Sequence, residues 1–331
     1  MLQRICVSKM AEFRATLPLF VKSITFEARG VRSFDLRSVD GADLPPFRPG
    51  AHIDLHLADR MIRSYSLTNS AAERHRYVVG VALDPSSRGG SRYMFDNVVV
   101  GDKLSASPPS NDFPLVEDAP HSVLIAGGIG ITPIWCMIQR LESLGRSWEL
   151  HYATRTRDLC AFRSELEAFE NHKSGRVNFI FDHEPGVQML DLPKLAAEIS
   201  GDAHVYCCGP APMLVAFEAA TKARRPETIH REYFAAANAP AANGGFTVDL
   251  ARAGTGHFVE PGKTILDTLI DAGLDVPYAC MNGVCGTCET TVIEGKPDHR
   301  DSLLSEEERA SGRTIMICCS GSLTDRLVLD L

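Results

Sequence analysis

The sequence predicts three domains in series: an antiparallel β-barrel, an α/β domain with a parallel sheet, and a smaller domain that carries a cysteine-rich loop. Residues 16–112 hold short segments of alternating polarity, residues 113–236 alternate between strand and helix patterns, and residues 246–331 contain three closely spaced cysteines. The uncharged stretch 237–245 precedes the third region and predicts a linker.

The composition is that of an ordinary globular protein. The 331 residues are 44% hydrophobic and 23% charged, with a formal net charge of −8. This length suffices for two or three domains that each bury a core. The acidic balance argues against nucleic acid as a partner. No apolar run approaches the roughly 20 residues of a membrane-spanning helix, so no membrane association is expected. Residues 1–20 carry four charged side chains and no secretory signal, so a cytoplasmic location is expected.

The first region has the period of β-structure. The segment 51–57 places Ile53, Leu55 and Leu57 on one face, and the segment 77–83 is a second candidate strand. Turns rich in glycine and proline lie between such segments. This pattern predicts an antiparallel barrel or sandwich.

The second region has the order of a parallel sheet. The apolar strand "HSVLIAGG" runs into a glycine turn, and residues 131–145 then predict a helix that ends at Gly145. The alternation continues through three further strands and three further helices: "SWELHYAT", "AFRSELEAFEN", "VNFIFD", "DLPKLAAEI", "AHVYCCG" and "APMLVAFEAATKA". Such alternation predicts a doubly wound sheet, which binds ligands at the carboxyl ends of its strands.

The third region contains the most specific motif. Cys280, Cys285 and Cys288 lie in "PYACMNGVCGTC", and a fourth thiol comes from "IMICCS". The spacing C-x4-C-x2-C…C is typical of plant-type [2Fe–2S] clusters. Cys318 is the preferred fourth ligand because it ends the apolar strand "IMIC", and Cys319 is the alternative. Zinc is a second possibility, but structural zinc sites usually take their ligands as two similarly spaced pairs.

These cysteine motifs resemble the C-terminal ferredoxin domain of the phthalate dioxygenase reductase-like flavoproteins. That family comprises reductase components of two-component Rieske oxygenases and O-demethylases, and the resemblance runs from about residue 16 to residue 331. It implies a flavin-binding β-barrel of ferredoxin-reductase type, a nicotinamide-binding α/β domain and a C-terminal β-grasp [2Fe–2S] ferredoxin domain. It also implies hydride transfer from NADH to FMN, followed by single-electron transfer through the cluster to an oxygenase component.

Two motifs of the first region suit a flavin. In "RSYSL", Arg63 could bind a phosphate and Tyr65 could pack on a ring, while "RGGS" opens a predicted helix whose bare N-terminus would attract an anion. The resemblance assigns Arg63 to the flavin phosphate, Tyr65 to the ring and Ser66 to the ring nitrogen that accepts hydride. It assigns a backbone contact with the ring to Val81. It further assigns phosphate contacts to Arg88, Gly89, Gly90 and Ser91.

The family's flavin is FMN, and no separate segment for the adenine of FAD is evident in the sequence. Two positions depart from the family pattern. Phe95 stands where many relatives have histidine, and Ser110 stands where many have a basic residue. We therefore expect FMN, with altered contacts at these two positions.

Two glycine turns of the second region suit a dinucleotide. "LIAGGIGITP" and "YCCGPAPM" each follow a buried strand, and glycine lets the backbone approach a pyrophosphate at the positive end of a helix. A single such turn is often only structural. The resemblance assigns the pyrophosphate contacts to Gly127, Gly128, Gly130, Thr132 and Pro133. It assigns the nicotinamide contacts to Cys208, Gly209 and Pro210. Cys208 is expected to pack beside the transferred hydride, so it and Ser66 are the candidate catalytic residues.

The choice between NADH and NADPH depends on charges near the adenosine ribose. Arg155 and Arg157 follow the second strand and could meet a 2′-phosphate, whereas Asp182 follows the third strand and could accept a hydrogen bond from a ribose hydroxyl. The family favours NADH, which we expect here. Glu232 and Phe234 match the family segment that closes this domain near the flavin.

The third region is acidic, with fourteen Asp or Glu against seven Lys or Arg over 240–331. Acidity can steer a basic patch of a partner, although it also serves solubility alone. The expected partner is a Rieske-type oxygenase in a transient complex. The alternatives are a redox sensor with a regulatory partner and a stand-alone NADH:acceptor reductase. The sequence contains no DNA-binding element that would favour the sensor.

Overall fold

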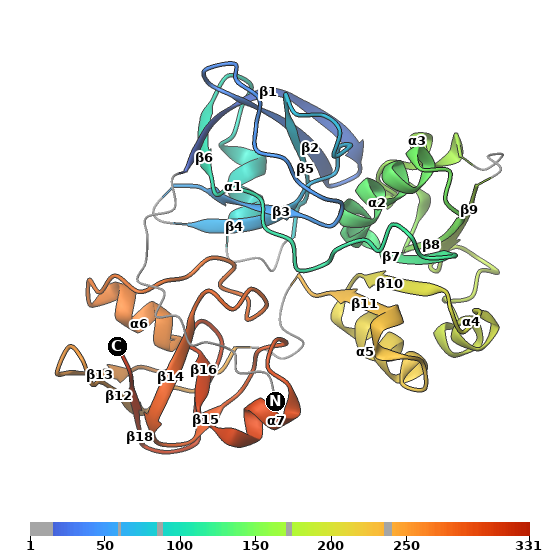
Figure 1. Cartoon of the computed structure of the whole chain (residues 1–331). Coiled ribbons are helices and arrows are strands. Elements are labelled where there is room, and N and C mark those ends of the chain that lie inside the picture. Colours follow the sequence, from blue (N-terminus) through green and yellow to red (C-terminus); the bar gives the residue numbers. More distant parts are fainter. Residues whose placement is uncertain (1–15, 59–60, 85–88, 170–173, 235–239) are drawn as a thin grey trace.

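The computed structural model describes residues 16–58, 61–84, 89–169, 174–234 and 240–331 (Figure 1). Three sheets, each built from one region of the sequence, define a barrel domain, a parallel-sheet domain and a cysteine-loop domain. This confirms the predicted fold class. Arg88 and the first part of the predicted linker, 237–239, lie outside the described residues. None of the helices in the described ranges is long and apolar enough to cross a membrane.

The barrel domain is a six-stranded antiparallel sheet in the order β4-β3-β6-β1-β2-β5. A bridge between Leu67 and Val79 links its two edges, so the sheet curls towards closure. Alternate residues such as Phe34, Ile53 and Tyr77 are fully buried inside it, as the period of two predicts. Its elements are β1 (Leu17–Ala28), β2 (Val31–Ser38), β3 (His52–His56), β4 (Ile62–Ser66), β5 (Tyr77–Ala82), α1 (Gly90–Asp96) and β6 (Lys103–Ala106).

The parallel-sheet domain has five parallel strands in the order β11-β10-β7-β8-β9. From β7 the chain adds β8 and β9 towards one edge of the sheet, and it then returns to add β10 and β11 towards the other edge. The topological switch point therefore lies between β7 and β10. Its elements are β7 (Ser122–Gly127), α2 (Ile131–Ser143), β8 (Trp148–Thr154), α3 (Arg163–Glu167), β9 (Gly175–Phe181), α4 (Leu192–Glu198), β10 (His204–Cys208), α5 (Ala211–Thr221) and β11 (Ile229–Glu232).

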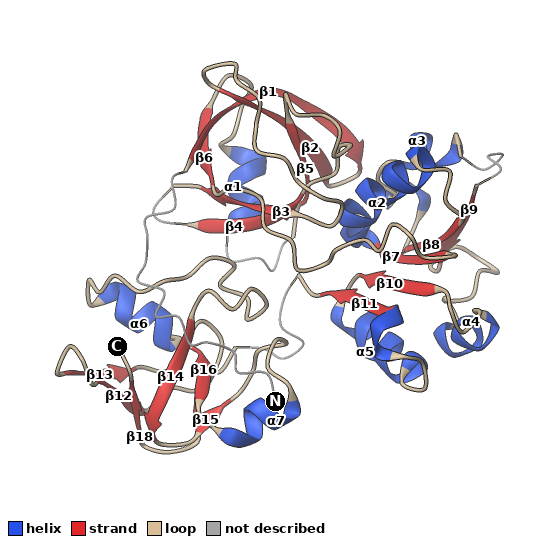
Figure 2. Cartoon of the chain, viewed as in Figure 1, coloured by secondary structure: helices blue, strands red, loops and turns tan. Residues whose placement is uncertain are grey.

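Helices cover both faces of this sheet, with α2 and α3 on one face and α4 and α5 on the other (Figure 2). Strand β7 is therefore apolar and buried from Val123 onwards. Leu124 and Ala126 join the core under α2, and Val123 and Ile125 join the core under α4 and α5. This packing places the glycine turns after β7 and β10 side by side at the carboxyl edge.

The cysteine-loop domain has a five-stranded mixed sheet in the order β13-β12-β18-β14-β16, crossed by helix α6. Only the pairing of β12 with β18 is parallel. The cysteine loop runs from α6 to β14, and a two-stranded sheet of β15 and β17 adjoins it. Its elements are β12 (Phe246–Leu250), β13 (Thr255–Val259), α6 (Ile265–Asp271), β14 (Glu289–Glu294), β15 (Pro297–Asp298), α7 (Glu306–Ser311), β16 (Thr314–Met316), β17 (Gly321–Ser322) and β18 (Arg326–Leu329).

The structure differs locally from four expectations. The helix expected in "AFRSELEAFEN" is shorter than predicted, since α3 covers only Arg163–Glu167. It begins after Phe162 because the backbone of Phe162 is left-handed (φ 55°). Strand β11 was not expected from the sequence. The strand expected to end at Cys318 ends at Met316. Ala241, expected in a linker, is buried and donates its N–H to the carbonyl of Cys319 (2.7 Å).

Candidate functional site

All three domains line one cavity of about 760 Å³. The barrel domain contributes most of β4 and part of β5, and the third domain contributes the cysteine loop. The parallel-sheet domain contributes the turn that follows β7 and the whole of β11. The lining includes Arg63, Tyr65, Ser66, Ser91, Thr132, Glu232, Phe234, Cys280, Asn282 and Cys285. Residues that the sequence motifs place up to 220 positions apart therefore meet at one site.

Strand β4 presents the predicted flavin residues to this cavity. Arg63 and Tyr65 are two positions apart, so the strand alternation directs both side chains to the same face. Burial raises the pKa of the Tyr65 phenol to about 12, and the nearby Arg63 charge offsets this only in part. Tyr65 is therefore neutral and offers an aromatic face and a hydroxyl, as packing against a ring requires.

The phosphate end of the predicted flavin site combines a cation with a helix N-terminus. Gly90, the first residue of α1, lies so close to Arg63 that a Cβ there would meet Arg63 Cγ at 2.5 Å. Gly89 has a left-handed backbone (φ 87°) that favours glycine, and it accepts the N–H of Tyr93. The guanidinium and the N–H groups at this end of α1 could bind a phosphate together.

Strand β5 forms the opposite wall. Gly80 and Ala82 line the cavity, whereas the side chain of Val81 is buried in the barrel core. A Cβ on Gly80 would lie 2.6 Å from Thr132 Cγ2, so glycine permits close packing between the two domains. Thr132 is also predicted to contact the dinucleotide, but its hydroxyl already donates to Ile129 O (2.9 Å). This domain contact was not visible in the sequence.

The two glycine turns of the parallel-sheet domain pack against each other. A Cβ on Gly130 would lie 2.1 Å from the carbonyl oxygen of Cys208, and a Cβ on Gly127 would lie 2.7 Å from Pro210 Cδ. Gly128, in contrast, has open space around its Cα and a φ of 53°. The turn is therefore accessible at Gly128, while the neighbouring glycines hold it against the strand that ends at Cys208. This cradle fits a pyrophosphate.

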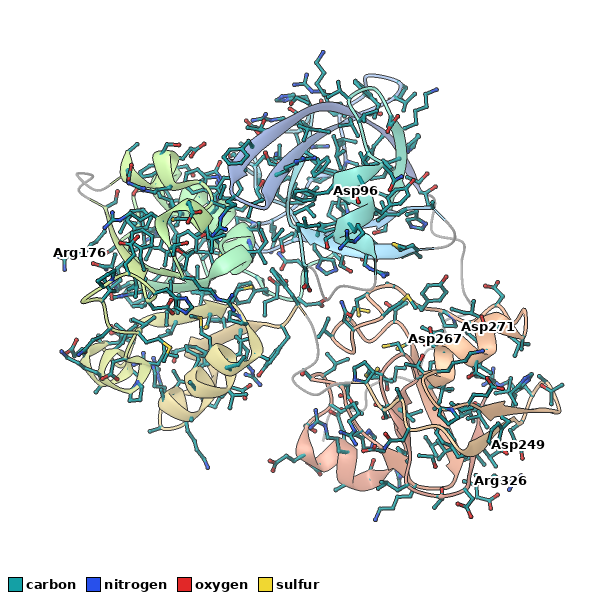
Figure 3. All side chains as sticks on the ribbon, turned by 180° about the vertical axis from the view of Figure 1, so that it is seen from behind. Asp96, Arg176, Asp249, Asp267, Asp271 and Arg326 are labelled. Atoms are coloured by element: carbon teal, nitrogen blue, oxygen red, sulfur yellow. The ribbon has the colours of Figure 1, made fainter. Side chains whose placement is uncertain are left out.

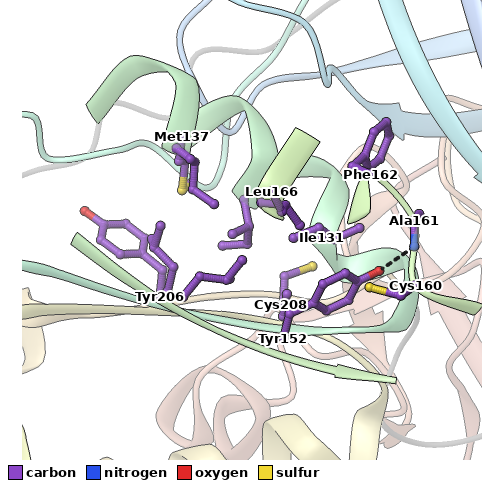
Figure 4. Packing of buried hydrophobic residues seen from close by; sticks show 14 of the residues in the cluster. Ile131, Met137, Tyr152, Cys160, Ala161, Phe162, Leu166, Tyr206 and Cys208 are labelled. Atoms are coloured by element: carbon purple, nitrogen blue, oxygen red, sulfur yellow. Dashed lines mark hydrogen bonds between the residues drawn. The ribbon is translucent and has the colours of Figure 1, made fainter. Parts of the chain in front are cut away.

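Cys208 is part of the core, as Figure 4 shows. The side chain is fully buried, and burial raises its pKa well above the ordinary thiol value. Its thiol donates to Glu232 Oε2 at 3.8 Å. A neutral, buried thiol is a poor nucleophile. The geometry therefore gives Cys208 a packing role behind Glu232, and its place beside the transferred hydride stays a prediction.

Glu232 is a buried carboxyl in the wall of the cavity. Burial raises its pKa to about 8; the hydrogen bond from Cys208 lowers it, and the charge of Asp112 raises it. Asp112 and Phe113 follow β6 and also line the cavity, although no sequence motif identified them. The carboxyl is thus mostly protonated at neutral pH.

We expect a pH signature from Glu232. Its pKa is higher in the folded than in the unfolded protein, so it stabilises the fold fully below pH about 4.5, and this stabilisation is lost as pH rises to about 8. Glu232→Gln cannot ionise and should lack this loss. When thermal unfolding of both proteins is followed between pH 4 and 9, the melting temperature of the variant should rise relative to that of the wild type as pH increases. Glu198→Gln, which alters an exposed carboxylate, is the control and should follow the wild type. If the melting temperatures of the wild type and Glu232→Gln changed with pH in parallel, the prediction would be contradicted.

Asp182 lies where the ribose contact is predicted, directly after β9. Its Oδ1 is buried and has no hydrogen-bond partner among the described residues, so an acceptor is available for a hydroxyl donor. Arg157 binds Glu184 (3.0 Å) and stacks on Phe181 (4.6 Å), whereas Arg155 is exposed. The free carboxylate oxygen favours NADH over the more highly charged NADPH.

The cysteine loop forms two pairs of thiols. A hydrogen bond from Cys280 lowers the pKa of Cys285 to about 6, and a hydrogen bond between Cys288 and Cys318 raises the pKa of Cys288. Each iron of a [2Fe–2S] cluster takes two protein ligands, so two pairs fit this cluster.

The loop also supplies a backbone hydrogen-bond donor to sulfur. The N–H of Asn282 donates to Cys280 Sγ at 3.3 Å, and the left-handed backbones of Gly283 (φ 68°) and Gly286 (φ 76°) allow the tight path. Cys319 contacts Cys318, and its Sγ lies 3.8 Å from Met316 O and from Ser320 Oγ, whereas Cys318 also hydrogen-bonds to Cys288. The arrangement favours Cys318 as the fourth ligand, as predicted.

The two departures from the family pattern have local partners. Phe95 lies under Arg32, whose guanidinium carbon is 4.5 Å from the ring centre. Ser110 Oγ lies 2.9 Å from Nε2 of His52, a cavity residue that no sequence motif identified.

His204 and His230 stack on each other, and burial lowers the pKa of His230 to about 4. His230 also lines the cavity, where its imidazole is neutral at pH 7.

Two parts of the chain match known domain families. Residues 124–219 match the oxidoreductase NAD-binding domain, and residues 251–321 match the 2Fe-2S iron-sulfur cluster binding domain. Together with the cavity that joins these two domains to the barrel, they define an NAD(P)H-dependent iron–sulfur oxidoreductase.

The whole chain is similar to proteins of known function. It is 52% identical to phenoxybenzoate dioxygenase subunit beta of Ectopseudomonas oleovorans, over 96% of this chain and 98% of that protein. It is 39% identical to phthalate dioxygenase reductase of Burkholderia cepacia, over 92% and 94%. A solved phthalate dioxygenase reductase, described as a modular structure for electron transfer from pyridine nucleotides to [2Fe–2S], matches with a TM-score of 0.80, 38% identity and coverage of 96% and 98%. The chain therefore belongs to the phthalate dioxygenase reductase family.

Proposed function

We propose that this protein is the reductase component of a Rieske-type aromatic-ring oxygenase or O-demethylase system, with NADH as donor and FMN and a [2Fe–2S] cluster as carriers. One observation carries the proposal: a single cavity is lined by members of all three predicted sites, namely Arg63, Tyr65, Ser66 and Ser91 of the flavin site, Thr132 of the nicotinamide site, and Cys280 and Cys285 of the cluster. Relatives named as a dioxygenase subunit and a phthalate dioxygenase reductase support the oxygenase partner.

Each side of the cavity has a separate role in this proposal. Arg63 and the N-terminus of α1 hold the flavin phosphate, Tyr65 packs on the ring, and Ser66, which is buried, donates to the ring nitrogen. The turn at Gly128 holds the pyrophosphate of NADH. Glu232, with Cys208 packed against it, would close the reacting face and exclude water there, while Cys280 and Cys285, which line the cavity, would hold one iron of the cluster.

The electrons balance without a general base. NADH leaves as NAD⁺ after giving up a hydride, which carries two electrons and one proton. The flavin supplies the ability to accept this pair and to release single electrons, which a [2Fe–2S] cluster can accept one at a time. Two such transfers to two acceptor sites of the oxygenase complete the cycle, and the proton passes to solvent.

The partner would dock on the cysteine-loop domain. This domain has twice as many acidic as basic residues over 240–331, and Asp267 and Asp271 lie on α6 (Figure 3). Arg326, on the central strand β18, is neutralised by Asp249 (2.6 Å) and Glu294 (3.0 Å). A basic patch on the partner would complement this surface, and the complex would weaken as salt rises.

The purified protein tests the proposal directly. Its visible spectrum should combine flavin bands with a broad iron–sulfur absorption, NADH should bleach both, and acid should release FMN and inorganic sulfide. Electron delivery to a purified Rieske-type oxygenase should then decline as salt increases. Absence of either chromophore would exclude the relay, and reduction of small dyes but of no oxygenase would favour a stand-alone reductase.

A further inference from the structure

Two neighbouring residues of the cysteine loop contact the two other domains. Met281 Sδ lies 3.7 Å from Nη1 of Arg63 on β4 of the barrel domain. Asn282 Nδ2 donates to the carbonyl oxygen of Phe234, two residues beyond β11 of the parallel-sheet domain, at 3.3 Å. The loop that carries the thiols is thus joined at adjacent positions to both halves of the flavin and nicotinamide machinery.

The backbone of Met281 is held in an unfavourable conformation. Its φ is 54°, in the left-handed region, and among the described residues only Phe162 shares this feature without being glycine. A side chain in this region is strained, and glycine would adopt the same conformation freely. Gly283 and Gly286, in the same loop, do so. A methionine at this position therefore indicates that its side chain has a role that offsets the strain.

The location of the two contacts indicates that role. Met281 directly follows Cys280, and Asn282 lines the cavity beside Cys280 and Cys285. The backbone N–H of Asn282 also donates to Cys280 Sγ at 3.3 Å. Contacts so close to a cluster ligand control how near the cluster lies to the opposite wall of the cavity, where Arg63 and Tyr65 are found.

We propose that Met281 and Asn282 are positioning residues that hold the cysteine loop against the flavin edge and thereby set the rate of electron transfer from flavin to cluster. This inference rests on the proposed function. It adds a coupling, because Arg63 is predicted to bind the flavin phosphate and also contacts Met281. Flavin binding and docking of the cysteine-loop domain should therefore favour each other, and this linkage is reciprocal.

The test uses the full-length protein loaded with FMN and cluster, as Met281→Ala, Asn282→Ala and the double variant. Alanine keeps a Cβ at position 281, so the left-handed strain remains while the thioether is removed. After rapid mixing with NADH, flavin bleaching should proceed at the wild-type rate in all variants. Reduction of the cluster, followed by freeze-quench electron paramagnetic resonance, should slow by about tenfold in the double variant because its docked population falls.

Three further measurements separate positioning from general damage. The resonance spectrum of the chemically reduced cluster should remain that of the wild type. The radius of gyration from small-angle X-ray scattering should increase in the double variant, and the affinity of the apoprotein for FMN should fall. Met281→Leu, which restores most of the side-chain volume, should recover part of the electron-transfer rate. Phe258→Ala, which removes an exposed ring of β13, should leave every quantity unchanged.

The outcomes distinguish this inference from the function on which it depends. A wild-type protein whose flavin NADH does not bleach would refute the proposed function itself. Normal bleaching, with an unchanged rate of cluster reduction and an unchanged radius of gyration in the double variant, would refute only the positioning role. If Met281→Ala lost its cluster, Asn282→Ala alone would decide, because the backbone donor to Cys280 is retained in that variant.

Discussion

Replacing Cys285 with serine is expected to lower NADH-driven reduction of the oxygenase by about 100-fold or more, because the cluster loses one of its four thiolates. Cys285 lines the cavity and pairs with Cys280. The hydride step depends on the other two domains, whose cores are separate from that of the cysteine-loop domain. Reduction of small two-electron dyes by NADH does not pass through the cluster, so it should stay within about twofold of the wild type.

A neighbouring thiol provides the matched control. Cys319 is fully buried, contacts Cys318 and is not a preferred ligand, so Cys319→Ala should keep the iron and sulfide content and the oxygenase activity. Iron and acid-labile sulfide analysis of both variants, beside the two activities, checks the prediction. If Cys285→Ser abolished dye reduction as well, the order from flavin to cluster would be wrong. If Cys319→Ala lost the cluster, the assignment of Cys318 would be wrong.

The second large effect is expected for Arg63→Ala. In the proposed site, its guanidinium lies on Gly90 at the N-terminus of α1 and binds the flavin phosphate. A hydrogen-bonded charge pair of this kind contributes about 2–3 kcal/mol, so the dissociation constant for FMN should rise by about 100-fold. Quenching of flavin fluorescence on titration into the apoprotein measures this constant.

Arg63→Lys separates charge from geometry. Lysine keeps the positive charge but not the planar fork of donors, so it should recover only part of the affinity. Lys103→Ala, which removes an exposed cation of the same domain on β6, should bind FMN as the wild type does. Equal FMN affinity in Arg63→Ala and the wild type would remove Arg63 from the phosphate site and leave the N-terminus of α1 as the remaining candidate.

Local patterns were sufficient for the fold class. The period of two in 51–57 and 77–83 identifies strands with one buried face, and both segments are strands of the barrel. The apolar run "VLIA" identifies a strand buried on both faces, as β7 is. Shorter elements were predicted less well. Strand β11 has four partly buried or exposed residues, and β16 ends before the cysteines because the chain turns there to direct Cys318 towards Cys288.

The amino-acid sequence by itself determined the kinds of chemistry that are present. Ligand spacing, glycine turns after buried strands and a cation beside an aromatic residue are local features, because each depends on neighbours within a few positions. Only the tertiary structure decided which of these features meet. The cavity joins Arg63, Glu232 and Cys280, and the contacts of Met281 and Asn282 reach across more than 40 positions. Such contacts arise from the packing of whole domains, and the single residues that make them carry no signal in the local pattern.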